Sequence, residues 1–203
     1  MSQALLQRIR TRLAGMATGE SASLGRGAGT PAAVLVPIIA HPDTPTLLLT
    51  LRARTLADHA GQISFPGGRI DSTDATAVAA ALREADEEVG LPASSVEVIG
   101  TMPEQRTGTG FRVTPVIGIV QPPLALRLAE AEVEEAFEVP LAYVLDAANH
   151  RRESATVRGV LRTYDVISYT QADRGERRIW GATAAILVNF ARHVAGDELR
   201  ASA

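Results

Sequence analysis

The sequence contains no cysteine, so disulfide bonds and thiolate chemistry play no part in its fold or function. Lysine is absent as well, because all 20 basic residues are arginine, and we interpret this bias as a trace of GC-rich coding. No apolar run approaches the ~20 residues of a membrane span. A net charge of −3 is also far from the basic composition typical of nucleic-acid-binding proteins. We therefore expect neither a membrane nor a nucleic acid as a partner, and the lack of cysteine is compatible with a reducing, cytoplasmic location.

The length of 203 residues and the hydrophobic content of 46% are enough for one domain with a proper core. We divide the chain into an N-terminal helix and linker (1–29), a main domain (30–195) and a C-terminal tail (196–203). Short apolar runs alternate with helical patterns along the main domain. This alternation predicts an α/β or α+β fold in which helices pack on a mixed sheet.

The N-terminal segment combines a regular apolar stripe with arginines. Leu5, Leu6, Ile9, Leu13 and Met16 recur at helical spacing, and the first acidic residue comes only at position 20. An amphipathic, arginine-rich and acid-poor segment is also typical of a transit peptide. We favour a short helix that docks on the main domain, because the stripe is regular and the residues after it read as a plain linker.

The main domain is expected to contain at least six strands and four helices. Strands are expected at 32–40, 46–51, 61–65, 95–102 and 111–120, with one or two more within 154–170. Helices are expected at 74–89, 129–138, 139–147 and 180–193. Asp74 is the expected N-cap of the first of these helices, and Gly90 is its expected C-terminal stop.

The helix expected at 74–89 carries the most informative residues of the chain. Glu84, Glu87 and Glu88 stand at i, i+3 and i+4, which places three carboxylates on one helical face. A solvated surface explains most such runs, but carboxylates in the last turn of a helix oppose its dipole by ~0.3–1 kcal/mol each. A bound Mg²⁺ or Mn²⁺ ion would remove that cost, and these ions prefer hard oxygen ligands. We therefore predict a metal site at these three residues.

Two glycines, Gly67 and Gly68, precede this helix and follow the strand expected at 61–65. Backbone amides without a nearby Cβ can approach a ligand closely, and such amides can cradle phosphate oxygens. A lone pair of glycines is more typical of a tight turn. Its place one short loop before the acidic helix favours phosphate binding, so the two features together indicate metal-assisted attack on a phosphate ester or anhydride.

The acidic helix also carries the signature of a known family. Residues 83–91 read READEEVGL and match the second half of the Nudix box: arginine-glutamate, aliphatic, any residue, glutamate-glutamate, any residue, glycine, aliphatic. The chain thus resembles the Nudix hydrolases. The first half departs from the box, because Asp74 follows Gly68 by six positions and stands where the family has glutamate.

This departure is itself similar to a subfamily, the coenzyme A pyrophosphatases. Members carry a box one residue longer and an upstream stretch that this chain matches at 48–74, LLTLRARTLADHAGQISFPGGRIDSTD. Segments 107–118, 132–141 and 179–187 also resemble the subfamily, so the likeness covers most of residues 32–190. It implies a Nudix-type α/β/α sandwich with a mixed sheet.

The resemblance further implies a reaction and its cofactor. The reaction is hydrolysis of the pyrophosphate of coenzyme A, or of an acyl-coenzyme A, to 3′,5′-ADP and 4′-phosphopantetheine. The cofactor is Mg²⁺ or Mn²⁺, held by Glu84, Glu87 and Glu88. The expected partner is therefore a small-molecule substrate, and a homodimer is left open.

Residues of the upstream stretch would help to select coenzyme A, namely Arg52, Arg54 and His59. The two arginines are two apart on an expected strand, so both would point to one face, as a phosphate clamp requires. Two exposed arginines on a sheet edge would look the same, and a structural hydrogen bond would equally explain the histidine. The candidates for contact with the 3′-phosphate are Arg69, Arg106 and Arg112.

The expected catalytic residues are Glu87, Glu132 and Arg83. A general base would come from one of the box glutamates or from the later acidic segment, at Glu132, Glu134 or Glu135. We favour Glu132, because it opens the stretch that resembles the subfamily, although a solvated helix is the alternative reading of this segment. Arg83 stands four residues before Glu87 and would steer that carboxylate.

Two other functions are weighed against this one. The first is a Nudix hydrolase of another nucleoside diphosphate derivative, such as ADP-ribose or an NTP, and the match at 48–74 argues against it. The second is a non-catalytic ligand-binding module on the same scaffold. The intact Arg83, Glu84, Glu87 and Glu88 argue against that alternative.

Overall fold

The computed structural model describes residues 2–14, 28–56, 59–157, 159–171 and 174–196. Met16, most of the expected linker and the tail from residue 197 onward lie outside these ranges. Within them, no helix has both the length and the apolar character required to cross a bilayer.

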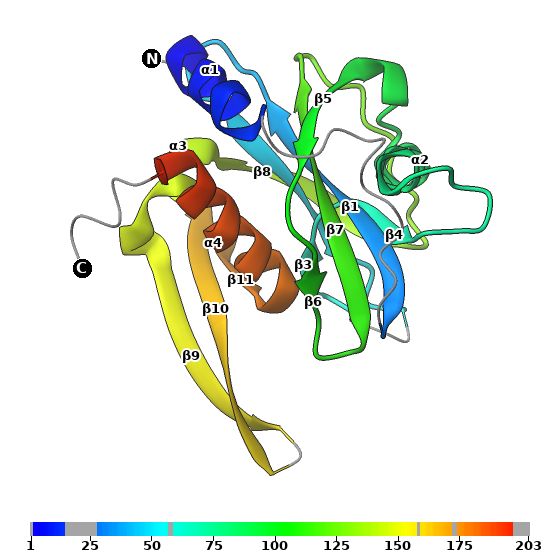
Figure 1. The fold of residues 1–203 in the computed structure, drawn as a ribbon, viewed down its shortest axis with the longest axis vertical. Coiled ribbons are helices and arrows are strands. Elements are labelled where there is room, and N and C mark those ends of the chain that lie inside the picture. The colour runs from blue at the N-terminus through cyan, green and yellow to red at the C-terminus, as the bar shows by residue number, and fades with distance from the viewer. Residues whose placement is uncertain (1, 15–27, 57–58, 158, 172–173, 197–203) are drawn as a thin grey trace.

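A mixed eight-stranded sheet forms the centre of the molecule (Figure 1). Its strands are Thr30–Ile39 (β1), Thr46–Arg52 (β2), Ile63–Ser64 (β3), Gly67–Arg69 (β4), Val96–Thr101 (β5), Gln105–Arg106 (β6), Phe111–Val120 (β7) and Val133–Pro140 (β8). The hydrogen-bonded order is β3-β2-β1-β7-β5, with β4 also paired to β1, β6 to β7 and β8 to β2. β1 runs parallel to β7, and the other pairs are antiparallel. Because both faces of this sheet are covered, β1 and β7 are nearly continuous apolar runs.

Helices cover the two faces of this sheet. They are Ser2–Leu13 (α1), Ala77–Val89 (α2), Leu141–Leu145 (α3) and Gly181–Ala195 (α4), with 3₁₀ turns at Ala93–Ser95 and Ala147–Asn149. α2 packs on one face through small residues such as Ala81 and Ala85, and α1 and α4 pack on the other face (Figure 1). The expected α/β/α sandwich with a mixed sheet is therefore confirmed.

The N-terminal helix docks on the domain, as expected. Leu6, Ile9 and Leu13 of α1 are buried in the same core cluster as Phe190 of α4. These positions recur every three or four residues, so one stripe of the helix faces the core while the rest stays in solvent.

A second, three-stranded sheet follows α3 in the chain. Its strands are His150–Val157 (β9), Val160–Gln171 (β10) and Gly175–Trp180 (β11), all antiparallel in the order β11-β10-β9. The hairpin of β9 and β10 extends away from the main sheet (Figure 1). The Tyr143 hydroxyl donates a hydrogen bond to the Ser168 carbonyl at 2.5 Å and so ties this sheet to α3.

The helix expected at 129–138 is wrong, because this segment forms β8 and the turn before it. Val133, Phe137 and Val139 are buried, and they recur with the period of two that is typical of a strand. β8 pairs antiparallel with β2 along this length. Glutamates occupy the outward and half-buried positions, which is why the segment looks like an acidic helix in the sequence.

The start of α2 differs from the expectation, whereas its C-terminal end agrees with it. Thr76, not Asp74, is the N-cap, and its hydroxyl accepts a hydrogen bond from the Ala79 N–H at 3.1 Å. Gly90 ends the helix in the left-handed conformation, with φ 67°. The helix thus ends at Val89, where the sequence predicts it to end, one residue after Glu88.

Candidate active site

The two glycines of β4 lie where the main sheet meets α2. Gly67 and Gly68 pair with Val34 and Ala33 of β1. Gly67 has φ +154°, and a Cβ on it would lie 2.5 Å from the Ala33 carbonyl oxygen and 2.6 Å from the Val34 Cα. A Cβ on Gly68 would lie 2.5 Å from Oε1 of Glu84. The backbone packing therefore requires glycine at Gly67, whereas Gly68 makes room for a carboxylate of α2.

Glu88 is a buried acidic residue of α2, only 4% exposed. Its Oε2 accepts a hydrogen bond from the Gly67 N–H at 3.2 Å, and its Oε1 lies 3.8 Å from Nη1 of Arg52. Burial raises the pKa of Glu88 to about 7, and these two contacts offset only part of the rise. The Gly67 amide is thus bonded to Glu88, and the phosphate cradle expected at the two glycines stays a prediction.

Glu84 lies one turn before Glu88 on the same side of α2. Burial raises the pKa of Glu84 above its ordinary value, although the nearby guanidinium of Arg83, with Nη1 3.1 Å from Oε1, favours the ionised form. The negative charge of Glu132 adds to the rise in pKa at both Glu84 and Glu88. Three acidic residues are therefore close enough to influence one another, and the site carries an excess of negative charge.

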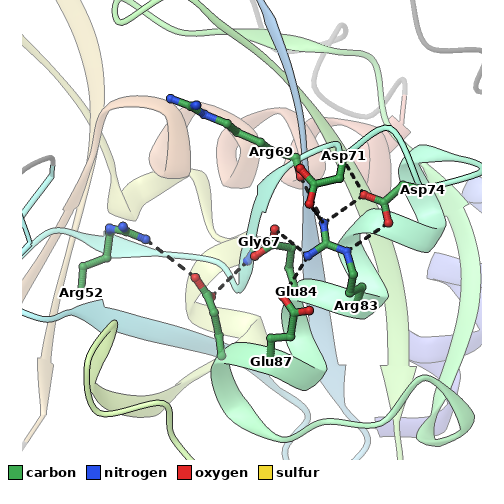
Figure 2. Close-up of polar contacts among 9 residues, drawn as sticks. Arg52, Gly67, Arg69, Asp71, Asp74, Arg83, Glu84 and Glu87 are labelled. Carbon is green, nitrogen blue, oxygen red and sulfur yellow. Dashed lines mark hydrogen bonds and ion pairs between the residues drawn. The ribbon is translucent and has the colours of Figure 1, made fainter.

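Arg83 organises the exposed side of the site (Figure 2). Its Nε and Nη2 donate to the two carboxylate oxygens of Asp74 at 3.1 and 2.9 Å, and Nη2 also reaches the Arg69 carbonyl at 3.3 Å. Its Nη1 donates to Oε2 of Glu87 at 2.8 Å, which is the steering contact expected from the sequence. The same guanidinium holds the pKa of Asp74 below its usual range. Arg83 thus fastens the loop after β4 to α2.

The bidentate bond between Asp74 and Arg83 replaces the helix cap that the sequence predicts for Asp74. The sequence feature that could have indicated this bond is the position of Asp74 in the box, nine residues before Arg83. A capping residue and an ion-pair partner are both short polar residues near a helix start. Sequence alone does not distinguish them without the path of the loop.

Glu132 reaches the site through the segment that follows β7. The N–H groups of Arg127 and Ala129 donate to the carbonyls of Val89 and Glu88 at 2.9 Å each, so this segment caps the end of α2. The chain then turns, and the Ala53 N–H donates to the Glu132 carbonyl at 2.8 Å. Glu132 is exposed in this turn, directly before β8.

Arg54 and His59, the other residues of the upstream stretch expected to bind substrate, lie beyond the end of β2. β2 ends at Arg52, so Arg54 lies in a turn beyond the strand, and the shared face expected for the two arginines is wrong. The side chain of Arg54 is 80% exposed, and its Nε lies 3.5 Å from Oε2 of Glu134. His59 is exposed, and its Nδ1 lies 2.9 Å from Oε1 of Gln62. Of these three expected residues, Arg52 alone contacts a glutamate of α2 in the ranges given above.

The donors of this site suit a hard divalent cation. Glu84 and Glu88 are two largely buried carboxylates whose charges are only partly compensated, and Mg²⁺ and Mn²⁺ prefer such oxygens. Within the described residues, no three His, Asp or Glu side chains are grouped closely enough to hold an ion. Glu84 and Glu87 both lie against the Arg83 guanidinium instead. The fit therefore rests on the chemistry of Glu84 and Glu88 and on the space that Gly68 leaves for a carboxylate.

The residues of this site lie within the part of the chain that matches a known protein family. A family model described as NUDIX domain matches residues 29–160. A protein of Escherichia coli strain K12 described as "Uncharacterized Nudix hydrolase NudL" is 46% identical over 163 residues, which cover 80% of this chain and 82% of that protein. A protein of the same description from Shigella boydii serotype 4 has the same identity and coverage. A solved MutT/nudix family protein from Enterococcus faecalis has a TM-score of 0.50 at 14% identity, covering 81% of this chain and 61% of that one, and so bears on the fold alone.

Metal-free protein is expected to lose stability as Glu88 ionises. Its pKa is raised from 4.5 to about 7 by folding, so the folded state holds the proton more tightly, and stability falls as pH rises through this window. Glu88→Gln removes this loss, so relative to wild type it should gain up to about 3 kcal/mol between pH 4.5 and pH 8. Urea unfolding in EDTA at both pH values measures the difference. Glu176→Gln, at an exposed site on β11, is the control, and a gain that does not change with pH would contradict the burial of this charge.

The two glycines are expected to differ in what alanine does to stability. Gly67→Ala should lower the free energy of unfolding by about 2 kcal/mol or more, because its Cβ meets backbone atoms at a positive φ. Gly68→Ala displaces only the flexible end of Glu84 and should cost less than about 1 kcal/mol. Thermal unfolding of the two variants side by side measures this contrast. Equal losses would show that the close approach of β4 to β1 is not the constraint described here.

Proposed function

Because the chain belongs to the NUDIX domain family, we propose that it hydrolyses the pyrophosphate of coenzyme A, or of an acyl-coenzyme A, to 3′,5′-ADP and 4′-phosphopantetheine. Membership of the family makes the protein a pyrophosphohydrolase that acts on a small-molecule nucleoside diphosphate derivative. The choice of coenzyme A within that class, and of Mg²⁺ or Mn²⁺ as the cofactor, is the proposal.

A contact between two sequence features carries this proposal. Arg52 belongs to the stretch that resembles the coenzyme A pyrophosphatases, and its Nη1 lies 3.8 Å from Oε1 of Glu88 in the family's box. Its Nε has no hydrogen-bond partner among the described residues, and a quarter of the side chain is exposed. A guanidinium with free donors beside buried carboxylates suits a substrate phosphate. The stretch that argues for coenzyme A thus borders the residues that argue for hydrolysis.

The proposed metal ligands are Glu84 and Glu88, and Glu87 would join them only by leaving its ion pair with Arg83. A bound Mg²⁺ or Mn²⁺ ion supplies charge neutralisation of the pyrophosphate and a water of lowered pKa. The chain itself supplies position: Gly68 lets the Glu84 carboxylate lie against β4, and the Gly67 N–H orients Glu88. Fixed geometry of this kind accounts for much of the rate enhancement in phosphoryl chemistry.

Arg83 acts in this proposal as a positioning residue. Its guanidinium holds Glu87 at 2.8 Å and Asp74 in a bidentate bond, so its donors are already engaged by the protein. It therefore acts on the reaction through the carboxylates that it orients.

Glu132 is the proposed general base. Its neighbours Glu134 and Glu135 are held in ion pairs with arginines, and Glu87 is paired with Arg83. Glu132 is exposed and takes part in no ion pair within the part of the chain that the structure describes. It is also close enough to Glu84 and Glu88 for its charge to raise the pKa of both. A free carboxylate at this distance is suited to accept a proton from the attacking water.

A cytoplasmic location, the lack of a nucleic-acid partner and a homodimer stay predictions from the sequence. The proposed chemistry needs none of them, because every residue assigned to it comes from one copy of the chain.

The proposal predicts that coenzyme A is hydrolysed with a higher kcat/KM than ADP-ribose or a dNTP when Mg²⁺ or Mn²⁺ is present. Chromatography of the products should yield 3′,5′-ADP and 4′-phosphopantetheine. A higher kcat/KM for ADP-ribose would favour another nucleoside diphosphate substrate. No turnover of any compound with either metal would favour a ligand-binding module without catalysis.

A single substitution controls this measurement. Glu88→Gln keeps the size of the side chain but removes the charge, and it should lower kcat/KM by about 100-fold or more. Calorimetric titration should show weaker uptake of Mn²⁺ by this variant. Glu176→Gln should behave as wild type in both assays, because the residue is exposed on β11 and away from α2. Undiminished turnover and metal uptake in Glu88→Gln would refute the role assigned to Glu88.

A further inference from the structure

A cavity separate from the acidic residues of α2 opens at the start of β7. Its volume is about 250 Å³, and its lining includes Gly29, Arg106, Phe111 and Arg112. We propose that Arg106 and Arg112 form a binding site in this cavity for a phosphate monoester, and that the monoester is the 3′-phosphate of the substrate. The identity of the ligand rests on the proposed function, whereas the anion site itself stands on the geometry that follows.

Arg112 is a buried cation with one donor that has no partner among the described residues. The residue is 5% exposed, and its Nε has no hydrogen-bond partner among the described residues. Its Nη1 lies 3.5 Å from Oε2 of Glu104, which is its one ion pair in those residues. A buried guanidinium is costly unless it is paired and hydrogen-bonded, and a single carboxylate at this distance does not meet that need. An anion in the cavity would add a second negative charge beside this guanidinium and an acceptor for its free donor.

Arg106 brings a second positive charge to the same place. It is the direct cross-strand partner of Arg112 in the antiparallel pair of β6 and β7, so both side chains leave the sheet on one face. Like charges directly opposite each other are unfavourable. An anion between them would turn this repulsion into attraction, and arginine binds phosphate oxygens through two parallel N–H donors.

The backbone around the two arginines is held in place before any ligand binds. The Thr30 N–H donates to the Gly110 carbonyl at 2.9 Å, and the Phe111 N–H donates to the Thr107 hydroxyl at the same distance. Gly29 has φ +117°, and a Cβ on it would lie 3.2 Å from Cγ of Arg112. The absence of a side chain at Gly29 therefore makes room for the stem of Arg112, which is packed rather than free to swing out.

Arg69 connects this cavity with the acidic site. It follows Gly68 directly on β4, and its guanidinium carbon lies 5.6 Å from the centre of the Phe111 ring. Phe111 in turn lines the cavity. One short strand thus leads from the glycine beside Glu84 to the ring beside Arg112. A substrate with phosphates at two separate places could occupy both sites along this path.

The size of the cavity favours one group of a ligand over a whole nucleotide. Pockets that enclose drug-sized molecules are typically about 300–1,000 Å³, and this one is smaller. A phosphate monoester carries up to two negative charges, and two arginines line the cavity, of which Arg112 is paired with one carboxylate, Glu104. A free phosphate ion has the same chemistry, so the test must separate the two sources.

Binding to metal-free protein tests the site without any turnover. Wild type should bind 3′,5′-ADP at least about 10-fold more tightly than 5′-AMP in calorimetric titrations, because the two differ only in the 3′-phosphate. Arg112→Gln and Arg106→Gln should each bring the two affinities to within about 3-fold of one another. Arg106 is exposed, so its variant keeps the test valid where the buried Arg112→Gln fails to fold. Arg151→Gln, at an exposed position of β9, should keep the wild-type preference.

Kinetics then connect the site with the reaction. The ratio of KM for dephospho-coenzyme A to KM for coenzyme A should be about 10 or more in wild type and in Arg151→Gln, and should fall toward 1 in both cavity variants. Hydrolysis of both substrates with equal KM in wild type would overturn the subsite and leave the proposed function intact. No hydrolysis of coenzyme A, with the preference for 3′,5′-ADP retained, would overturn the proposed function and leave the subsite intact. Competition by inorganic phosphate without any preference for 3′,5′-ADP would assign the cavity to the free ion and overturn its role in substrate binding.

Discussion

The Glu84 and Glu88 carboxylates are held against the two glycines of β4, and the rest of this site depends on that constraint. Glu84 and Glu88 lie on the side of α2 that faces β4, and burial raises the pKa of both. The last turn of α2 contains no basic residue, so the helix dipole adds to their mutual repulsion. They are not free to move away, because Ala81 and Ala85 are fully buried against the sheet and fix the rotation of the helix. The fold thus maintains an unfavourable concentration of negative charge at one place.

Two arginines limit that cost in different ways. Arg52 approaches Glu88 from β2 at 3.8 Å, too far for a hydrogen bond, and so gives charge compensation without closing the site. Arg83 forms short bonds to Asp74 and Glu87 and so stabilises the loop between β4 and α2. Arg52 keeps an unpaired Nε donor, whereas the donors of Arg83 are engaged in bonds to Asp74 and Glu87. Residues of the same type thus have different roles in the proposed function, Arg52 in binding and Arg83 in structure, and their contacts distinguish them.

The same distinction explains which parts of the molecule could be predicted from the sequence. The strand at 111–120 and the end of α2 at Gly90 can be predicted from the sequence, because an apolar run and a terminal glycine are local signals. The acidic face of α2 follows from spacing alone. The segment 129–138 resembles a helix in the sequence because its glutamates mask the alternation of Val133, Phe137 and Val139, and pairing with β2 makes this alternation visible. The end of β2 agrees with the strand expected at 46–51 to within one residue, and Arg54 lies beyond it.

The distribution of charge resolves an apparent conflict between composition and function. A protein of net charge −3 is poorly suited to attract an anionic substrate through its overall field. Screening limits the reach of exposed charges to about 8–10 Å at physiological salt, so local charge matters more than the total. Here acidic residues gather at one end of β4, beside Gly68, while Arg69 and Arg112 lie toward its other end. A substrate that carries a metal-bound pyrophosphate at one place and a bare phosphate at another would experience attraction at both, because each group meets a charge of the opposite sign.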